Sequence, residues 1–416
     1  MKTHTRMKKK ISVAYFTTAT ARAGAEEHLL SLVQQLDRRY FDVYLACSPE
    51  LARLLGPDLP NDVEVLEVYF ERPTQLSAAF QVGRFLRRHG IDILHSHMFR
   101  ASLVASPLAK LCGVPVTIET PHVREEWRRG LLKSRFFIDR LGGRFVDYYI
   151  AVSESNARYL SDVKGVPQSK IRVIQNGIDL SQFDPQHIAP EGLRQSLGFG
   201  PDDPVMALFG RLEPQKGHAV LLEALNDVRK EFPNARLICA GDGSLRGELE
   251  RRASQLDLLG NVRFVGFQSN VPDWLASADF CVLPSFYEGL PLAAIESLAA
   301  GRTMVATSVD GTPEVILDGQ TGFLVPPGDV HALAAAISRL IREPVLRRRF
   351  AKAGRTLVTN QFRVERQIEK TQELYWQTWE EKARGQAEKI PQQNERPTAN
   401  RELLNRESAS AAPPRP

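Results

Sequence analysis

Short runs of hydrophobic residues alternate along this chain with longer stretches in which hydrophobic residues recur every three or four positions. The short runs are rich in Val, Ile, Leu and Phe, which is typical of strands buried on both faces of a parallel sheet. The longer stretches, such as 26–36 and 76–89, have the period of amphipathic helices. The strands expected in the first half of the chain are 11–16, 41–47, 63–69, 91–95, 114–119, 148–152 and 171–175.

The alternation stops after Asn176-Gly-Ile-Asp179 and resumes near residue 205. The segment between them is polar and rich in proline, as expected of a linker. The pattern on both sides predicts two α/β domains, each with a parallel sheet covered by helices. A ligand in the crevice between them would meet the carboxyl ends of both sheets. The strands expected in the second half are 205–209, 236–240, 262–265, 280–283, 303–306 and 323–325.

The same pattern divides the chain into five parts. A Rossmann-like first domain is expected over 1–180, a linker over 181–203, and a Rossmann-like second domain over 204–360. A last helical pattern, which is aromatic and highly charged, occupies 361–384. The remaining segment, 385–416, is dominated by glutamine, proline, serine, asparagine and charge, so we expect it to be disordered.

Composition changes this picture little. A chain of 416 residues can form two cores, and hydrophobic and charged fractions of 43% and 25% are those of a globular protein. A net charge of +5, from 54 basic and 49 acidic side chains, is too small and too dispersed to indicate nucleic-acid binding. The chain has no run of about 18 apolar residues, so we expect no transmembrane helix.

The cysteines and the N-terminus bear on the compartment. The four cysteines are far apart, lie in or beside hydrophobic runs and form no metal-binding motif, which predicts buried free thiols in a reducing cytoplasm. Lys8-Lys9-Lys10 and the short run after it loosely imitate a signal peptide. Because three threonines interrupt that run, we expect no export.

Glu288 and Glu296 lie eight residues apart around the expected start of a helix. Pro291, between them, suits the first helical position because its ring fixes φ and it has no N–H. Glu288 is then expected in the preceding loop and Glu296 in the helix, on either side of backbone N–H groups that bind phosphate. Taken alone, two such glutamates are more often ordinary surface residues. With the rest of the chain, the segment predicts a clamp for a nucleotide-sugar.

A loop with cationic side chains follows the first expected strand of the second domain. It contains Arg211 and Lys216 and precedes a helix that begins near His218. A planar guanidinium and a compact ammonium both suit phosphate oxygens. Such a loop is by itself more often a solvated basic turn. Because it should share a sheet edge with the Pro291 helix start, we interpret it as the second half of a diphosphate site.

Glycines mark two further loops. Gly24, between the first strand and its helix, would let the backbone approach a ligand closely, although one glycine is weak support. Gly241 and Gly243 begin like a dinucleotide fingerprint, but Arg246 stands where the third glycine should be. We therefore interpret that segment as a turn.

His95, His97 and His122 fall at or just after expected strand ends in the first domain. Since strand ends are where an α/β domain forms its site, we favour His122 as a contact to a sugar. A metal site is not expected, because the chain has no Asp-X-Asp and the histidines lack helical ligand spacing.

Several short segments together carry a family resemblance. They are Glu288-Gly-Leu-Pro-Leu-Ala-Ala-Ile-Glu296, Gly210-Arg211 with Lys216-Gly217, Ala151-Val-Ser-Glu154, Asn176-Gly-Ile-Asp179, Gly241-Asp-Gly243 and Gly311-Thr-Pro-Glu314. In this combination the chain resembles the retaining glycosyltransferases of family 4, which have the GT-B fold. The likeness covers about residues 10 to 380 and is stronger in the second half.

The resemblance implies that the first domain holds an acceptor and the second a nucleotide-diphosphate sugar. Arg211 and Lys216 would neutralise the diphosphate, and Glu296 would hold the ribose hydroxyls. The family usually has two adjacent glycines in the first-domain loop, where this chain has Ala23-Gly24. The donor sugar would be held by Glu288 and by the backbone of Gly289, Leu290, Pro291 and Leu292, and the base would be met near Gly266 and Phe267.

The resemblance also implies a reaction. Family members usually need no metal or other cofactor, which agrees with two cations and a helix start supplying positive charge to a leaving diphosphate. We name no protein nucleophile and expect the leaving phosphate to act as the base. The residues expected to serve catalysis are Arg211, Lys216, Glu288 and His122.

The expected function is the transfer of a sugar to a hydroxyl of a saccharide or lipid-linked acceptor, in polysaccharide, lipopolysaccharide or glycolipid assembly. Two alternatives remain on the same architecture, a nucleotide-sugar epimerase and a non-catalytic nucleotide-sugar binding module. The sequence lacks the epimerase motifs, and its intact cations and glutamates argue against a decayed binder. The sugar, the base and the acceptor do not follow from the sequence.

Residues 124–145 mix arginines and a lysine with aromatic and aliphatic side chains. Such a stretch can lie on an anionic bilayer, where a lipid-linked acceptor would be found. The alternative is a helix that packs on its own sheet and exposes a cationic face, and the two are almost evenly balanced. The first would place a cytoplasmic protein peripherally on the inner face of the membrane.

Overall fold

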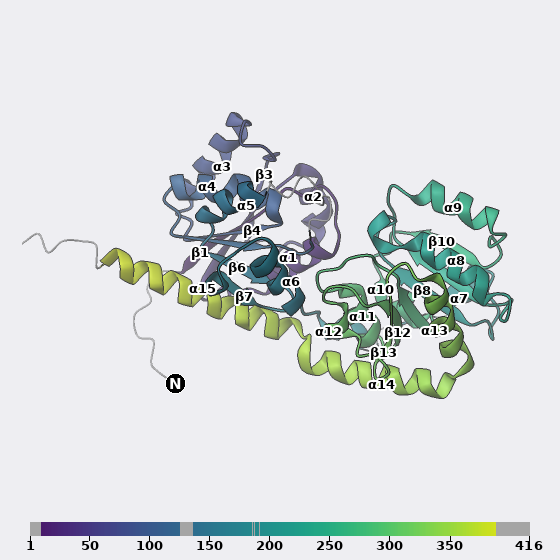
Figure 1. Ribbon diagram of the computed structural model, residues 1–416. Helices are drawn as coiled ribbons and strands as arrows, with labels where there is room; N and C mark the ends of the chain where they lie inside the picture. The colour runs from purple at the N-terminus through teal and green to yellow at the C-terminus, as the bar shows by residue number, and fades with distance from the viewer. Residues whose placement is uncertain (1–9, 125–135, 185, 187, 191, 388–416) are drawn as a thin grey trace, which may run out of the picture.

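The computed structural model describes residues 10–124, 136–184, 186, 188–190 and 192–387. Two α/β domains lie side by side, and a long C-terminal helix runs from the second domain back along the first (Figure 1). Every strand pair within the two sheets is parallel. The expected class, two Rossmann-like domains, is confirmed.

The first domain contains a seven-stranded sheet in the order β3-β2-β1-β4-β5-β6-β7. Each strand overlaps an expected hydrophobic run. However, β4 and β5 both begin two residues later than expected, because Ile91 and Val114 still bond to the end of the preceding helix. This shift places both His95 and His97 inside β4. The strands are β1 Ile11–Thr17, β2 Phe41–Cys47, β3 Glu64–Glu67, β4 Ile93–His97, β5 Val116–Thr120, β6 Tyr148–Ala151 and β7 Ile171–Val173.

Helices cover both faces of this sheet, which explains why its strands are hydrophobic without alternation. Tyr15 and its neighbours on one face pack against α1 and the C-terminal helix, whereas Phe16 and its neighbours on the other pack against α3 and α4. The helices are α1 Gly24–Gln35, α2 Pro49–Leu55, α3 Leu76–Arg88, α4 Phe99–Leu111, α5 Phe136–Gly142 and α6 Glu154–Arg158.

The second domain contains a six-stranded sheet in the order β10-β9-β8-β11-β12-β13. Its strands are β8 Val205–Phe209, β9 Arg236–Ala240, β10 Val262–Gly266, β11 Phe280–Leu283, β12 Met304–Thr307 and β13 Gly322–Val325. Its helices, with α7 in the linker, are α7 Leu193–Ser196, α8 His218–Val228, α9 Arg246–Gln255, α10 Val271–Ala276, α11 Leu292–Ala299, α12 Thr312–Val315 and α13 Val330–Arg342.

The chain ends with two long helices, α14 Pro344–Gln361 and α15 Val364–Ala387. The first packs on the second domain, while α15 crosses to the first domain (Figure 1). Tyr375 of α15 is buried there, and its hydroxyl lies 2.6 Å from Nδ1 of His95. The helix therefore ties the two domains together. Residues 388–416, most of the segment expected to be disordered, lie outside the described residues.

Short helical turns complete the connections. They are η1 Gly56–Asp58, η4 Gly143–Phe145, η5 Tyr159–Val163, η6 Gln168–Lys170, η7 Leu180–Phe183 and η9 Pro214–Lys216. All four cysteines are free, and only Cys112 is not fully buried. Among the described residues, no helix combines the length and the apolar character needed to cross a bilayer.

The order of the strands locates the site. In the first sheet the order reverses between β1 and β4, and in the second between β8 and β11. Ligands of open parallel sheets bind outside the carboxyl ends of strands at such a reversal. Gly24 begins the helix that follows β1, the connection after β8 contains the Arg211 to Lys216 segment, and the loop after β11 contains Glu288. Most of the expected site residues therefore follow the two reversal points.

Candidate active site

A buried ion pair joins the loop after β8, which contains Lys216, to the loop after β11, which contains Glu288. Lys216 Nζ lies 2.6 Å from Glu288 Oε1, and the Ser285 hydroxyl donates to the same oxygen at 2.7 Å. The two charged side chains are only 15% and 6% exposed. A carboxylate that already accepts two hydrogen bonds is held in one position. The structure thus brings together two residues that the sequence placed 72 positions apart.

Backbone contacts fix the loop that carries Glu288. Phe286 N–H donates to the Gln215 carbonyl at 2.8 Å, and the Gln215 side chain donates to the Tyr287 carbonyl at 2.9 Å. Gly217 has a φ of 67°, and a Cβ there would lie 2.1 Å from the Pro284 carbonyl oxygen. Only glycine fits this position. The loops after β8 and β11 therefore form one rigid unit.

Helix α11 begins directly after this unit. Pro291 is its N-cap, and Leu292 is its first residue. This corrects the expectation that Pro291 would be the first helical residue, and it leaves Glu288 in the loop and Glu296 in the helix as expected. The start of α11 has no side-chain cap among the described residues. Its first N–H groups can therefore bind an anion.

Glu296 lies on α11 and is half-buried. Burial raises the pKa of its carboxyl group to about 7, and the negative charge of Glu27 in the first domain adds to this rise. Lys216 opposes both effects. Glu296 therefore faces the cation of its own domain and a carboxylate of the other domain.

Arg211 is exposed at the carboxyl end of β8 and faces the first domain. Its positive charge acts on Glu26, near the start of α1 in the first domain. Burial raises the pKa of Glu26 to about 7, while hydrogen bonds from its own backbone and from Ala23, together with the charge of Arg211, oppose this rise. Arg211 is therefore electrostatically coupled to the start of α1, whereas Lys216 acts on Glu288 and Glu296 of its own domain.

The two domains touch at glycines. A Cβ on Gly289 would lie 1.7 Å from the His122 carbonyl oxygen, and a Cβ on Gly311 would lie 3.0 Å from Cβ of Ser153 in the first domain. A Cβ on Gly24 would lie 3.7 Å from Leu292. Gly24, Gly289 and Leu292, all expected in the site, are thus brought together, and Gly289 has no room for a side chain. The expected close approach of backbone to ligand is also a close approach of domain to domain.

His122 lies two residues beyond β5, with its carbonyl against Gly289 and its side chain turned into the first domain. Its Nε2 is 3.1 Å from Nδ1 of His97, and the ring is buried. Burial and neighbouring histidines hold the pKa of His122 well below its usual range. The imidazole is therefore neutral and already engaged in a hydrogen bond.

Gly266 and Phe267 lie apart from the ion pair. Gly266 ends β10 at the edge of the sheet and Phe267 follows it, and β9 separates β10 from β8. Gly266 has a φ of 73°, and the Phe267 ring is 64% exposed. An exposed ring next to the crevice is free to stack on a base, but nothing in the described residues joins it to Lys216 or Glu288.

Asp310 and Arg124 form part of the site that the sequence analysis did not assign to it. Asp310 accepts a hydrogen bond from the Glu288 N–H at 2.9 Å and pairs with Arg124 of the first domain at 2.6 Å. Asp310 also has a positive φ of 43°, which is uncommon outside glycine. Asp310 follows β12 by three residues, so its place after a strand end was the available signal. Arg124 was assigned only to the basic segment.

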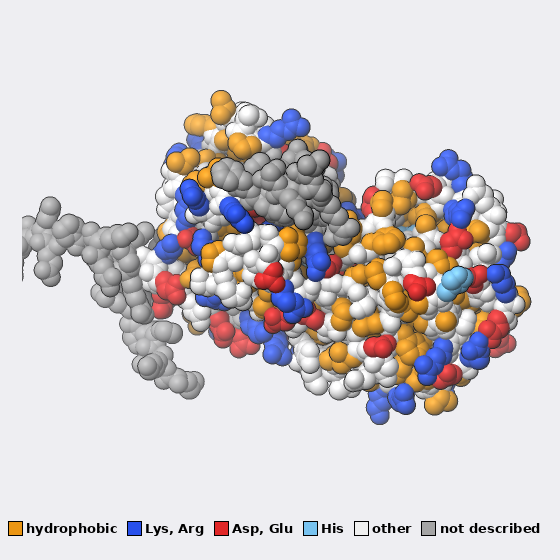
Figure 2. All heavy atoms as spheres, in the orientation of Figure 1, with side chains coloured by type: hydrophobic (Ala, Val, Ile, Leu, Met, Phe, Trp, Pro, Cys, Tyr) orange, Lys and Arg blue, Asp and Glu red, His pale blue; other side chains and the backbone are white. Residues whose placement is uncertain are grey.

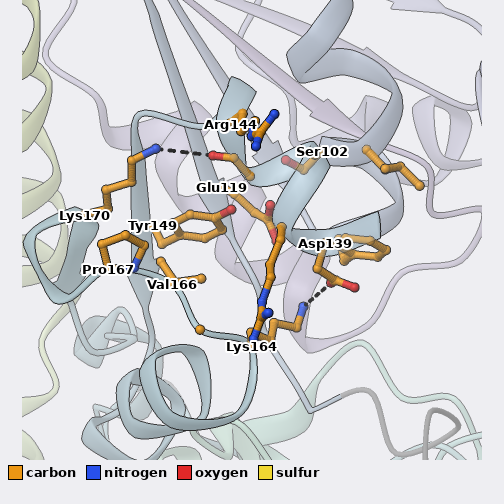
Figure 3. A pocket seen from close by; sticks show the side chains of 15 residues that line it. Ser102, Glu119, Asp139, Arg144, Tyr149, Lys164, Val166, Pro167 and Lys170 are labelled. Atoms are coloured by element: carbon orange, nitrogen blue, oxygen red, sulfur yellow. Dashed lines mark hydrogen bonds and ion pairs between the residues drawn. The ribbon is translucent and has the colours of Figure 1, made fainter. Parts of the chain in front are cut away.

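A separate cavity lies inside the first domain, between α4, α5 and the turn after η5. Its volume is about 200 Å³, and none of the expected site residues lines it. Lys164 and Asp139 form a buried ion pair at its wall, 3.3 Å apart (Figure 3). The expected site residues therefore lie outside this cavity.

Charge is mixed over the visible surface of the second domain, where basic and acidic side chains are interspersed (Figure 2). Arg211 and Lys216, the cations expected to bind the diphosphate, lie on the connection after β8, where Arg211 is exposed and Lys216 is half-buried. A small, anionic ligand with hydroxyl groups would find cations, N–H groups and carboxylates there within one loop unit.

Comparisons with known proteins match both halves of the chain. Residues 22–182 match the family model described as Glycosyltransferase Family 4, and residues 191–357 match the one described as Glycosyl transferases group 1. These two segments contain every expected site residue.

Individual relatives are distant but cover much of the chain. An Escherichia coli UDP-Gal:alpha-D-GlcNAc-diphosphoundecaprenol alpha-1,3-galactosyltransferase is 23% identical and covers 88% of this chain and 97% of its own length. A Mycobacterium tuberculosis glycogen synthase is 32% identical over 65% of each chain. The crystal structure of Anabaena HepE in complex with UDP and glucose is 21% identical, covers 88% of this chain and 99% of its own, and superimposes with a TM-score of 0.77.

Proposed function

The chain belongs to the glycosyltransferases of family 4, with the GT-B fold, and we propose that it moves a sugar from a nucleotide-diphosphate donor to a hydroxyl group with retention of configuration. The observation that carries this proposal is the buried pair of Lys216 and Glu288 beside the start of α11. Since Lys216 has three N–H donors, it can keep Glu288 and still donate to a phosphate.

The proposed roles follow from this arrangement. Arg211 and Lys216 neutralise the charge that develops on the leaving diphosphate, and the first N–H groups of α11 assist them. Glu288 and the backbone of 289–292 orient the donor sugar, while Glu296 accepts hydrogen bonds from the ribose hydroxyls. His122 is the proposed sugar contact of the first domain, and it can reach the sugar only when its ring turns away from His97, against which it lies buried. The leaving phosphate takes the acceptor proton, so no protein nucleophile is required.

We propose that the transfer needs no metal. Two cations and an uncapped helix start already provide the positive charge that a departing diphosphate requires. Among the residues that the structure describes, no group of three or more carboxylates lies close enough together to hold Mg²⁺. Glu288 is occupied by Lys216 and Ser285. Turnover that persists undiminished in the presence of a chelator would support this proposal, and turnover abolished by the chelator would refute it.

The acceptor is proposed to be a saccharide or a lipid-linked saccharide. One relative is named for a diphosphoundecaprenol-linked acceptor and a UDP-sugar, and a structural neighbour was crystallised with UDP and glucose. These names favour UDP-sugars as the first donors to test and a place in polysaccharide, lipopolysaccharide or glycolipid assembly.

The test is a panel of uridine, guanosine and adenosine diphosphate sugars, with nucleotide release measured with and without acceptor. Arg211→Ala and Lys216→Ala should each lower turnover by roughly 10²-fold, as for the loss of one key electrostatic donor. Arg348→Ala, at an exposed position on α14, is the control and should be unaffected. A binding module would release no nucleotide, and an epimerase would alter the sugar without acceptor. Retention is read from the anomeric configuration of the product by NMR.

We further propose a cytoplasmic protein in peripheral contact with an anionic membrane through residues 124–145. Residues 125–135 lie outside the described part of the chain. In the described part, Arg140 and Arg144 flank Leu141 and Phe145, which are 47% and 36% exposed. Flotation with liposomes that contain anionic lipid should recover the protein, and Leu141→Ser with Phe145→Ser should reduce recovery. Equal recovery with neutral liposomes would contradict an electrostatic contact.

A further inference from the structure

Three buried histidines from separate elements meet at the carboxyl edge of the first sheet. His28 lies on α1, His97 ends β4, and His122 follows β5. One ring nitrogen of each lies within 4.8 Å of one ring nitrogen of the other two. Their spacing in the sequence gives no sign of this arrangement, because the fold alone brings the three elements together.

Hydrogen bonds determine where the ring lone pairs lie. The Asn176 amide nitrogen donates to the Leu290 carbonyl at 3.4 Å, so its Oδ1 is the acceptor for Nδ1 of His28 at 2.7 Å. His28 therefore carries its proton on Nδ1 and its lone pair on Nε2. Nε2 of His97 is buried and has no hydrogen-bond partner among the described residues. Burial keeps the rings neutral, and it lowers the pKa of His28 to about 4.

A fourth buried histidine of this region, His95, differs from these three because both of its ring nitrogens have hydrogen-bond partners. His95 also lies in β4, but its Nδ1 contacts the Tyr375 hydroxyl at 2.6 Å and its Nε2 the Thr120 hydroxyl at 2.7 Å. Both of its nitrogens are satisfied, so it has no lone pair to offer. The region thus separates one structural histidine from three that converge.

We propose that His28, His97 and His122 form a binding site for one transition-metal ion of the Zn²⁺, Co²⁺, Ni²⁺ and Cu²⁺ class. Neutral imidazoles suit these ions, whereas Mg²⁺ and Mn²⁺ prefer the oxygen ligands that this cluster lacks. The orientation of His28 by Asn176 is the kind of outer contact that metal-bound histidines use.

The distances are compatible with such an ion. Zn²⁺ binds imidazole nitrogen at about 2.0–2.1 Å, so two tetrahedral ligands lie about 3.3 Å apart. Nδ1 of His97 and Nε2 of His122 are already 3.1 Å apart. Binding breaks the hydrogen bond between these two rings, moves its proton to the opposite ring nitrogen, and draws the third ring inward by side-chain rotation. Three ligands leave a fourth position for water.

The site adjoins the crevice. Asn176 bridges His28 to the Leu290 carbonyl, and the His122 carbonyl contacts Gly289. A bound ion would hold His122 in the cluster and away from a sugar. We therefore expect Zn²⁺ to inhibit transfer, a consequence that rests on the proposed function, whereas binding of the ion does not.

The test uses Co²⁺, whose visible absorption reports coordination. Chelator-treated, full-length protein should bind one equivalent of Co²⁺ with a tetrahedral spectrum, and one equivalent of Zn²⁺ should remove it, while excess Mg²⁺ should not. His28→Gln and His97→Gln should each weaken Co²⁺ binding by about 10²-fold or more, since loss even of an outer contact costs 10- to 100-fold. His331→Gln, at a 92% exposed position in the second domain, is the matched control.

Several outcomes would overturn the site. These are the absence of a Co²⁺ spectrum in the wild type, unchanged affinity in His28→Gln, and a loss in His331→Gln as large as that in the cluster variants. Each variant is measured below its own melting transition, and the Co²⁺ and Zn²⁺ competition in the wild type needs no variant. Failure of the metal site would leave nucleotide release from donor sugars unchanged, so it is distinguishable from failure of the proposed function.

Discussion

The ion pair between Lys216 and Glu288 can be tested by a double-mutant cycle on stability. Lys216→Met and Glu288→Gln remove each charge and nearly preserve the volume of each side chain. Ser285 can still donate to the amide oxygen of Gln, so the second variant keeps one of the two contacts to Glu288 Oε1. The cycle compares both single variants with the double variant and so isolates the interaction between the two side chains.

The expected energy of the interaction between Lys216 and Glu288 follows from their separation and burial. Two unit charges 2.6 Å apart attract by about 6 kcal/mol at an effective dielectric constant of 20, before the cost of burying them. Removal of one partner of a buried pair typically costs about 3–5 kcal/mol, because the other charge stays buried alone. Lys216→Met should fall in that range. The double variant should be less destabilised than the sum of the single variants by at least about 2 kcal/mol.

Urea unfolding of the four proteins measures this coupling energy. The matched control is the exposed pair of Lys230 and Asp227, which has a similar separation of 2.7 Å but a Lys230 side chain that is 69% exposed. Its coupling should be below about 1 kcal/mol and should fall further in salt, whereas that of the buried pair should persist. If Lys216→Met and Glu288→Gln add within about 0.5 kcal/mol, the pair is not coupled and the rigid unit inferred for the two loops is wrong.

Three further predictions concern the crevice. Since the pKa of Glu26 and of Glu296 is raised from 4.5 to about 7, the native protein holds protons that the unfolded chain has released. The contribution of these two groups to the free energy of unfolding should therefore be largest below pH 4.5 and should fall as the pH rises to about 7. The fall is at most about 1.4 kcal/mol per pH unit for each group. Glu296→Gln should make the free energy of unfolding depend less on pH over this range. Gly289→Ala should force the domains apart, seen as a larger radius of gyration in X-ray scattering and lower turnover, whereas Gly247→Ala, with no neighbour within 4 Å, should do neither. Asp310→Ala should raise the KM for the donor, whereas Asp310→Asn should raise it less, because Asn tolerates a positive φ and its side-chain oxygen can still accept from the Glu288 N–H. An equal KM in both variants would exclude this hydrogen bond as the cause of the higher KM.

The strands were predictable because burial on both faces leaves a simple signal, a run of hydrophobic residues without polar alternation. The two loops with Arg211 and Glu288 were predictable for a related reason, since parallel sheets place the residues after their strands at one edge. Pro291 shows the limit of this reasoning. Its ring suits both the N-cap and the first helical position, and the difference of one residue depends on the backbone of the loop before it.

Contacts between distant parts of the chain were not predictable. The pairing of Arg124 with Asp310 and the convergence of His28 with His97 and His122 depend on how α1, β4 and β5 are placed by the whole sheet. Helix α15 illustrates the same point, because its aromatic pattern showed that it packs somewhere but not that it packs on the first domain. Periodicity identifies the buried face of an element and leaves its partner undetermined.

The contacts between the domains use the loops that the proposed function assigns to the donor, and this has a consequence for turnover. The Glu314 carboxylate accepts hydrogen bonds from the N–H groups of Glu154 and Ser155 at the start of α6, and Arg124 pairs with Asp310, which also holds the Glu288 N–H. Gly289 contacts His122 at the same place. Closure of the crevice and completion of the sugar site are therefore one event, because the same loop residues take part in both. Arg124 is 37% exposed, so water can solvate its guanidinium when the pair separates, whereas Asp310 is 7% exposed and keeps the Glu288 N–H as a partner. The proposed function requires the domains to separate for donor entry and product release, and a step of domain opening is expected to limit turnover whenever the chemistry itself is fast.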